Sequence, residues 1–182
     1  VFADFTLEVY TSALFNLALT ELKNPSLGNG NVQNGLYTKY GYPNDWFWPT
    51  AVGGTDGAGH LTNLDSLFSS GTVSNTFIDT FNAPLSNWKT GNVIVMYGLF
   101  KFCVAFNRDI SSWDTRKVGD MSYMFQGAYS FNQDISSWKV SSTSLAYPQP
   151  MLHWMFNGAT AMMAMYQHYE GFATTPTEDF FY

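Results

Sequence analysis

The residues that could bind a metal or carry out catalysis are few and poorly spaced. The three histidines, His60, His153 and His168, show neither the His-x-x-x-His nor the Cys-x-x-Cys spacing of a metal site. The single cysteine, Cys103, excludes an internal disulfide and is expected to be a buried core thiol. Methionines are dense over 151–165, as in copper-binding clusters, but methionine also commonly fills gaps in cores. No Gly-x-Ser-x-Gly nucleophile motif occurs, so we expect no metal, no cofactor and no enzyme.

The acid pair Asp109 and Asp134 has a more regular spacing of 25 residues. In neighbouring turns of the chain, two such carboxylates would lie about 5 Å apart and could bind calcium or transfer protons. Each aspartate belongs to an Asn-x-Asp-Ile-Ser segment, in which aspartate commonly bonds its own backbone. Pro84 stands where a third carboxylate would continue the column. We therefore expect both carboxylates to be structural.

The same spacing defines an internal repeat. FNRDISSW at 106–113 is followed by FNQDISSW at 131–138, and a weaker copy begins at Phe81. A unit this short cannot bury its own apolar side chains, so we expect the copies to stack as coils and cover one another. We also expect each asparagine to bond the backbone of the adjacent coil. The shared positions are Phe81, Phe106 and Phe131; Asn82, Asn107 and Asn132; and Trp88, Trp113 and Trp138.

The stretch WDTRKVGDMSYMFQGAYSFNQDISSW at 113–138 resembles the repeat of the BspA-like surface proteins, a leucine-rich-repeat-like family. Stacking of the copies predicts a short solenoid with one parallel strand per coil. The resemblance implies that this α/β repeat fold is leucine-rich-repeat-like. It also implies adhesion or protein binding, no catalytic motif, and a secreted or cell-surface location. Because insertions interrupt the register, we expect a short, edited solenoid of about four to five coils.

The remaining segments are expected to close the two ends of the stack. Residues 2–22 have helical spacing of apolar residues and predict an N-terminal cap, or else a helix that docks on a partner. Residues 159–169 predict a closing helix. We divide the chain into a capping helix with a degenerate first coil (1–60), the repeat solenoid (61–162), and a C-terminal cap and tail (163–182).

Composition limits the classes of partner. The net charge of −6 argues against nucleic acid, which requires clustered lysine and arginine. Only 12% of residues are charged and 18% are aromatic, which suits either covered surfaces or a repeat protein with uncharged polar residues outside. The sequence contains no uncharged apolar stretch of about 18 residues or more, so we expect no transmembrane helix. Because residue 1 is Val, we expect a processed or partial product.

The strongest functional signal is a row of aromatic residues. In each predicted strand the two residues between the apolar positions should face outward, which places Tyr97, Tyr123 and Trp154 in a row beside His153. Tyrosine and tryptophan are over-represented in binding hot spots, although they also simply favour strands. We predict that this strand face binds a protein or glycan partner. The alternative is a structural accessory subunit, built permanently into a large multi-protein assembly.

Overall fold

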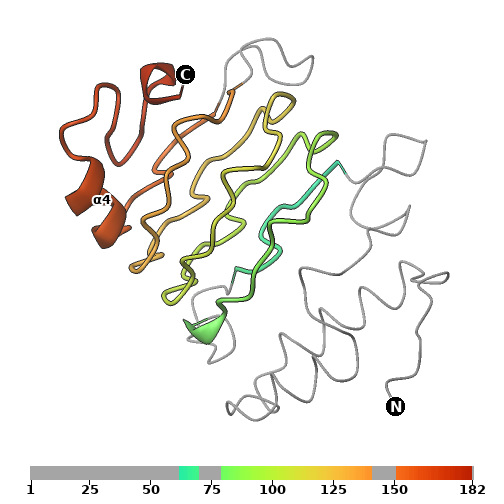
Figure 1. Cartoon of the computed structure of the whole chain (residues 1–182), viewed down its shortest axis with the longest axis horizontal. Helices are drawn as coiled ribbons and strands as arrows, with labels where there is room; N and C mark the ends of the chain where they lie inside the picture. The colour runs from blue at the N-terminus through green and yellow to red at the C-terminus, as the bar shows by residue number, and fades with distance from the viewer. Residues whose placement is uncertain (1–61, 70–78, 141–150, 182) are drawn as a thin grey trace, which may run out of the picture.

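The computed structural model describes residues 62–69, 79–140 and 151–181. Within these residues, successive turns of the chain lie side by side and run in the same direction (Figure 1). Each turn, which we call a coil, combines a ladder segment with an arc segment. The ladder segments are 62–69, 93–103, 118–128 and 151–159, and the arc segments are 81–90, 106–115 and 131–140.

The predicted α/β solenoid with one parallel strand per coil is wrong. No strand is present in the described ranges; the ladder segments are joined instead by isolated parallel bridges, namely Asn63 to Val95, Val95 to Asp120, and Asp120 to Met151. The helical elements with bounds in these ranges are α4 (Thr160–Tyr166) and the 3-10 helix η3 (Glu178–Phe180). The α4 helix is shorter than the helix predicted over 159–169, and the predicted helix at 2–22 lies outside the described residues.

Consecutive tight turns replace the strand. In the segment 118–128, the N–H of Met124 donates to the carbonyl of Met121 at 3.2 Å, and the N–H of Ala128 donates to the carbonyl of Phe125 at 3.0 Å. The third residue of each turn has a left-handed backbone, with φ of 61° at Tyr123 and 68° at Gly127. This is the conformation that a type II turn requires. Because a left-handed residue recurs after four residues, at Tyr123 and again at Gly127, the backbone of this segment cannot remain extended.

The ladder segments are nevertheless joined by regular backbone hydrogen bonds. Beyond each bridge, alternate N–H groups of one segment donate to carbonyls of the next segment at 2.7–3.1 Å, as in Met96 to Asp120, Gly98 to Ser122, Phe100 to Met124, and Phe102 to Gln126. Beyond the bridges the earlier coil donates to the later, whereas bonds in the opposite direction occur at the bridges, as in Gly119 to Ile94 at 2.9 Å. A parallel strand pair requires each strand to donate and to accept in turn. The turns therefore explain why bridges form without strands.

Columns of stacked aromatic rings form the core. Phenylalanine and tryptophan rings at equivalent positions lie nearly parallel, with centroids 5.7–6.3 Å apart, and all of these side chains are buried. Such pairs add about 0.5–1.5 kcal/mol each beyond the burial of their area. Identical residues recur because each ring packs on its own equivalent. The columns are Phe68, Phe100, Phe125 and Phe156; Phe81, Phe106 and Phe131; and Trp88, Trp113 and Trp138.

Side chains also satisfy the backbone of the arc segments. The N–H of Asn107 donates to Oδ1 of Asn82 at 3.0 Å, and the N–H of Asn132 donates to Oδ1 of Asn107 at 3.1 Å. The indole N–H groups of Trp113 and Trp138 donate to carbonyls of the preceding coil at 3.0 and 3.2 Å. These side chains therefore pair backbone N–H and carbonyl groups of the arc segments that have no strand partner.

The C-terminal segment occupies the place of a further coil. The N–H of Phe156 donates to the carbonyl of Thr174 at 3.0 Å, and the N–H of Trp154 donates to Oγ1 of Thr175 at 2.8 Å. The ring of Phe180 meets that of Phe156 edge-on at 6.0 Å. Donors of the last ladder segment are thus satisfied without another repeat. No helix in residues 62–69, 79–140 or 151–181 is long and apolar enough to cross a membrane.

Candidate binding surface

Tyr97, Tyr123 and Trp154 lie together on the surface, and we call these three residues the aromatic ridge. The ring centroids of Tyr97 and Tyr123 are 5.3 Å apart, and those of Tyr123 and Trp154 are 6.2 Å apart, with planes inclined by 57° and 58°. Trp154 is 54% exposed, both tyrosines are half-buried, and His153 is exposed next to Trp154. The structure therefore brings the four predicted binding residues together, but on turns instead of strands.

The expected outward orientation of both residues between the apolar positions does not hold in every coil: His153 and Trp154 are exposed, but the two preceding coils differ. Ser122 is buried, with 1% of its surface exposed, and Gly98 is buried as well. Tyr97 occupies the place equivalent to Ser122, whereas Tyr123 and Trp154 occupy the place equivalent to Gly98. The three aromatic residues of the ridge therefore do not all occupy the same repeat position: Tyr97 stands one position before the place of Tyr123 and Trp154.

Tyr123 and Trp154 occupy a costly backbone conformation, with φ of 61° and 52°. A bulky residue at positive φ costs about 1–3 kcal/mol, whereas glycine adopts this conformation freely. The equivalent residue of the preceding coil is Gly98, with φ of 56°, so a glycine completes the same turn there. The aromatic side chains are therefore placed where the turn alone would favour glycine.

Phe102 is a further bulky residue at positive φ (63°), but packing explains it. Its ring covers Gly127 of the next coil, where an added Cβ would lie only 2.5 Å from the Cδ1 atom of Phe102. Trp154 differs, because more than half of its surface is exposed. Packing between coils therefore explains the positive φ of Phe102, whereas it does not explain that of the exposed Trp154.

Charged and polar groups border the ridge. The ammonium of Lys101 lies 5.1 Å from the ring centroid of Tyr123, within the range of a cation–π interaction. Burial, followed by the nearby Tyr123, Asp120 and Asp65, raises the pKa of Tyr97. The Tyr97 phenol therefore keeps its proton, and remains a hydrogen-bond donor, throughout the physiological pH range.

The predicted acid pair is occupied by local bonds. The Oδ1 atom of Asp109 accepts hydrogen bonds from the N–H and hydroxyl of Ser111 at 2.9 and 2.7 Å, which lower the pKa of Asp109. Asp134 makes the equivalent bonds with Ser136 at 3.0 and 2.7 Å. Across the described part of the chain, no three or more His, Cys, Asp or Glu side chains gather in a way that could hold a metal ion.

The other chemical candidates are dispersed. Cys103 is buried, and its thiol lies 3.1 Å from the carbonyl oxygen of Phe68. His168 is exposed beyond the end of α4, whereas His60 lies outside the described residues. Within the described part of the chain, Cys103 and His168 form no metal-binding group with His153.

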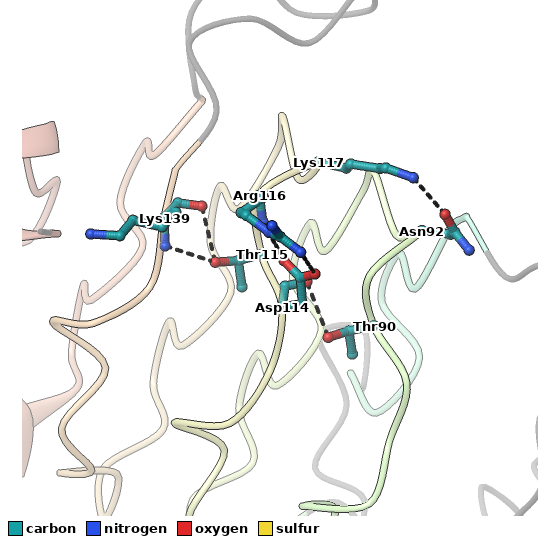
Figure 2. Close-up of polar contacts among 7 residues, drawn as sticks. All are labelled: Thr90, Asn92, Asp114, Thr115, Arg116, Lys117 and Lys139. Atoms are coloured by element: carbon teal, nitrogen blue, oxygen red, sulfur yellow. Dashed lines mark hydrogen bonds and ion pairs between the residues drawn. The ribbon is translucent and has the colours of Figure 1, made fainter.

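A cationic surface went unrecognised in the sequence and lies at the end of the arc segments. We call Lys89, Arg116, Lys117 and Lys139 the basic corner; Figure 2 shows the last three of them, and Lys89 shares the repeat position of Asp114 and Lys139. Arg116 donates to Asp114 from Nε at 2.9 Å and from an Nη atom at 2.6 Å, and this pair lowers the pKa of Asp114 to about 2. The sequence signal for this surface is the repeat register: Lys89 and Lys139 occupy the same repeat position as Asp114. Arg116 and Lys117 follow that position closely in the middle coil, so the register predicts neighbouring cations.

Residues 59–180 match the family described as "Mycoplasma protein of unknown function, DUF285", and the chain belongs to this family. It is, in general, a BspA-like repeat family. Neither a curated protein nor a solved structure matches the chain. Membership of a family of surface-like repeat proteins is compatible with a non-enzymatic surface module.

Proposed function

We propose that the chain is a non-enzymatic interaction module of a secreted or surface protein, and that it binds a protein partner through the aromatic ridge. The observation that carries this proposal is the placement of Trp154. Its side chain is 54% exposed at a backbone position that favours glycine. A residue that costs folding energy and remains exposed is expected to be retained for contact with another molecule.

The ridge has the properties of a protein-binding surface. Tyrosine and tryptophan provide a large contact area while losing little conformational entropy, because each has only two side-chain torsions. The ridge is held by backbone bonds between coils, such as Tyr123 N–H to the His153 carbonyl at 2.9 Å. Such preorganisation reduces the cost of ordering the surface on binding. The Tyr97 hydroxyl and the Lys101 ammonium add polar contacts at its edge.

The test is affinity capture from a gentle extract of the native source, with the wild-type chain and two double variants immobilised in parallel. Tyr123→Ser with Trp154→Ser removes the ridge. Tyr129→Ser with Tyr169→Ser removes two aromatic side chains that are 54% and 50% exposed elsewhere. Loss of a hot spot worth about 2 kcal/mol weakens binding roughly thirty-fold.

We expect one protein to be retained by the wild type and by the control variant, and lost from the ridge variant. Equal retention by all three chains would refute a role for the ridge. A partner that is retained after protease treatment of the extract, but lost after deglycosylation, would instead identify a glycan ligand.

A second candidate function is that of a structural accessory subunit. Exposed apolar side chains other than the ridge, Tyr129, Met165 and Tyr169, favour it, as does the low charged fraction of 12%. Light scattering on the native particle separates the two functions. A mass near the 20.4 kDa of the chain supports a free-standing module, whereas a mass of hundreds of kilodaltons supports a built-in subunit.

A further inference from the structure

The basic corner concentrates positive charge on an acidic protein. Four of the eight Lys and Arg residues of the whole chain belong to it, together with the carboxylate of Asp114, which is paired with Arg116. The corner therefore carries +3, and because the chain carries −6, the rest of it carries −9. A charge distribution this uneven attracts anionic groups to the basic corner.

Hydrogen bonds between coils hold the backbone beneath these cations. The hydroxyl of Thr90 donates to the carbonyl of Asp114 at 3.1 Å, and the hydroxyl of Thr115 donates to the carbonyl of Lys139 at 3.0 Å (Figure 2). The N–H of Lys139 in turn donates to Oγ1 of Thr115 at 3.1 Å. The cations are therefore presented from ordered, neighbouring coils.

The cations retain donors for a ligand. The guanidinium of Arg116 has five N–H groups, and Asp114 accepts from its Nε and from one Nη atom. Lys117 donates one of three ammonium protons to Oδ1 of Asn92 at 2.6 Å (Figure 2). Lys89 and Lys139 are exposed and form no ion pair with any carboxylate that the structure describes.

The spacing of the coils limits the shape of the ligand. The rings of Trp88 and Trp113 are 5.9 Å apart and those of Trp113 and Trp138 are 6.3 Å apart, which gives the local repeat distance. The residues that follow these tryptophans are Lys89, Asp114 and Lys139. In an extended peptide, side chains on one face recur every two residues, at roughly 6.5 Å. Such a peptide, laid across the coils, would present one side chain to each.

We infer that the basic corner binds an extended acidic protein segment with acidic residues at alternate positions. Each of three successive coils contributes at least one cation to it: Lys89, then Arg116 with Lys117, then Lys139. A long polyanion such as nucleic acid is disfavoured, because the other described residues hold eight acidic and only two basic side chains. This site is separate from the aromatic ridge and does not depend on the ridge function.

The inference is tested with a fluorescent peptide of alternating serine and glutamate, and with a peptide of the same composition whose glutamates form one block. Fluorescence polarisation is measured in low salt and at about 0.15 M ionic strength. The test variant is Lys89→Gln with Lys139→Gln. The control, Lys101→Gln with Arg108→Gln, removes the same charge elsewhere. Heparin and single-stranded DNA serve as competitors of other polyanion classes.

We expect the alternating peptide to bind more tightly than the block peptide and to weaken as salt rises. The test variant should bind it roughly two- to thirty-fold more weakly, while the control variant loses less. The inference is overturned if neither peptide binds in low salt, if both peptides bind equally, or if the two variants lose affinity equally. Heparin or DNA that binds while the alternating peptide does not would also overturn it, in favour of another class of anion.

Discussion

Alanine substitution at Gly127, compared with Gly158, tests the stacked-turn geometry quantitatively. Both glycines occupy the same turn position in successive coils, with φ of 68° and 77°. An alanine at either position bears the cost of a left-handed backbone, about 1–2 kcal/mol. The positions differ in what surrounds an added Cβ, so the comparison isolates the contact between coils.

At Gly127 the added Cβ would lie 2.5 Å from Cδ1 and 3.0 Å from Cε1 of Phe102, so that the ring must move. At Gly158 the nearest atoms, from Gly127, are 3.5 Å away, an ordinary contact. Overpacking of this kind costs about 1–3 kcal/mol. We therefore expect Gly158→Ala to lower the free energy of unfolding by about 1–2 kcal/mol, and Gly127→Ala by about 2–5 kcal/mol.

The assay is urea denaturation followed by tryptophan fluorescence, with the free energies compared where the transitions remain two-state. In a Phe102→Gly background, the excess cost of Gly127→Ala should disappear, because the ring that meets the Cβ is gone. Equal losses for both glycine variants, within about 0.5 kcal/mol, would refute the stacking of Phe102 on Gly127.

Other perturbations test the asparagine bonds between arc segments and the Asp114–Arg116 pair of the basic corner. Asn107→Ala removes the acceptor of the Asn132 N–H and should lower the free energy of unfolding by about 1–3 kcal/mol. The control Asn92→Ala, on the surface, should change it by less than about 0.5 kcal/mol. Equal effects of the two variants in denaturant melts would contradict a stabilising role for the asparagine bonds between arc segments. Folding lowers the pKa of Asp114 from 3.8 to about 2. The ionised carboxylate therefore contributes to the free energy of unfolding above pH 3.8, and this contribution is lost as the pH falls through 2. Because Arg116 is largely exposed, that contribution should not exceed about 1 kcal/mol. Acid titration of stability should show a smaller loss over this window in Asp114→Asn, and an unchanged profile would contradict the assignment.

The repeat made the packing partners predictable from the sequence. Residues 25 apart, such as Phe106 and Phe131, lie in one column, with ring centroids 5.9 Å apart. This works because stacking of equivalent coils places each side chain on its own copy. The spacing of Asn82 and Asn107 likewise located a side chain that bonds the next coil.

The backbone conformation was not predictable in the same way. The apolar positions Val118, Met121 and Met124 recur every three residues, and the period of two that marks a strand is absent. The turn signal was hidden as well, since Tyr123 and Phe102 occupy positions where glycine would have revealed a left-handed residue. Strands were therefore predicted from the stacking of short repeat units, where the structure has turns.

The candidate site was partly predictable for the same reason. The row of aromatic residues could be found from the repeat register, but the burial of Ser122 depends on the turn and could not. The basic corner required the register to be applied to charges, by comparing Lys89 with Lys139 across two coils.

Site-specific photo-cross-linking tests the central claim, binding through the aromatic ridge, most directly. A photoreactive residue replaces His153, beside Trp154, in one chain and His168, beyond α4, in another; both histidines are exposed. The account predicts a protein adduct from position 153 that is absent at position 168 and is lost when Trp154→Ser is added. An adduct from position 168 alone, or one at position 153 that survives Trp154→Ser, would contradict it.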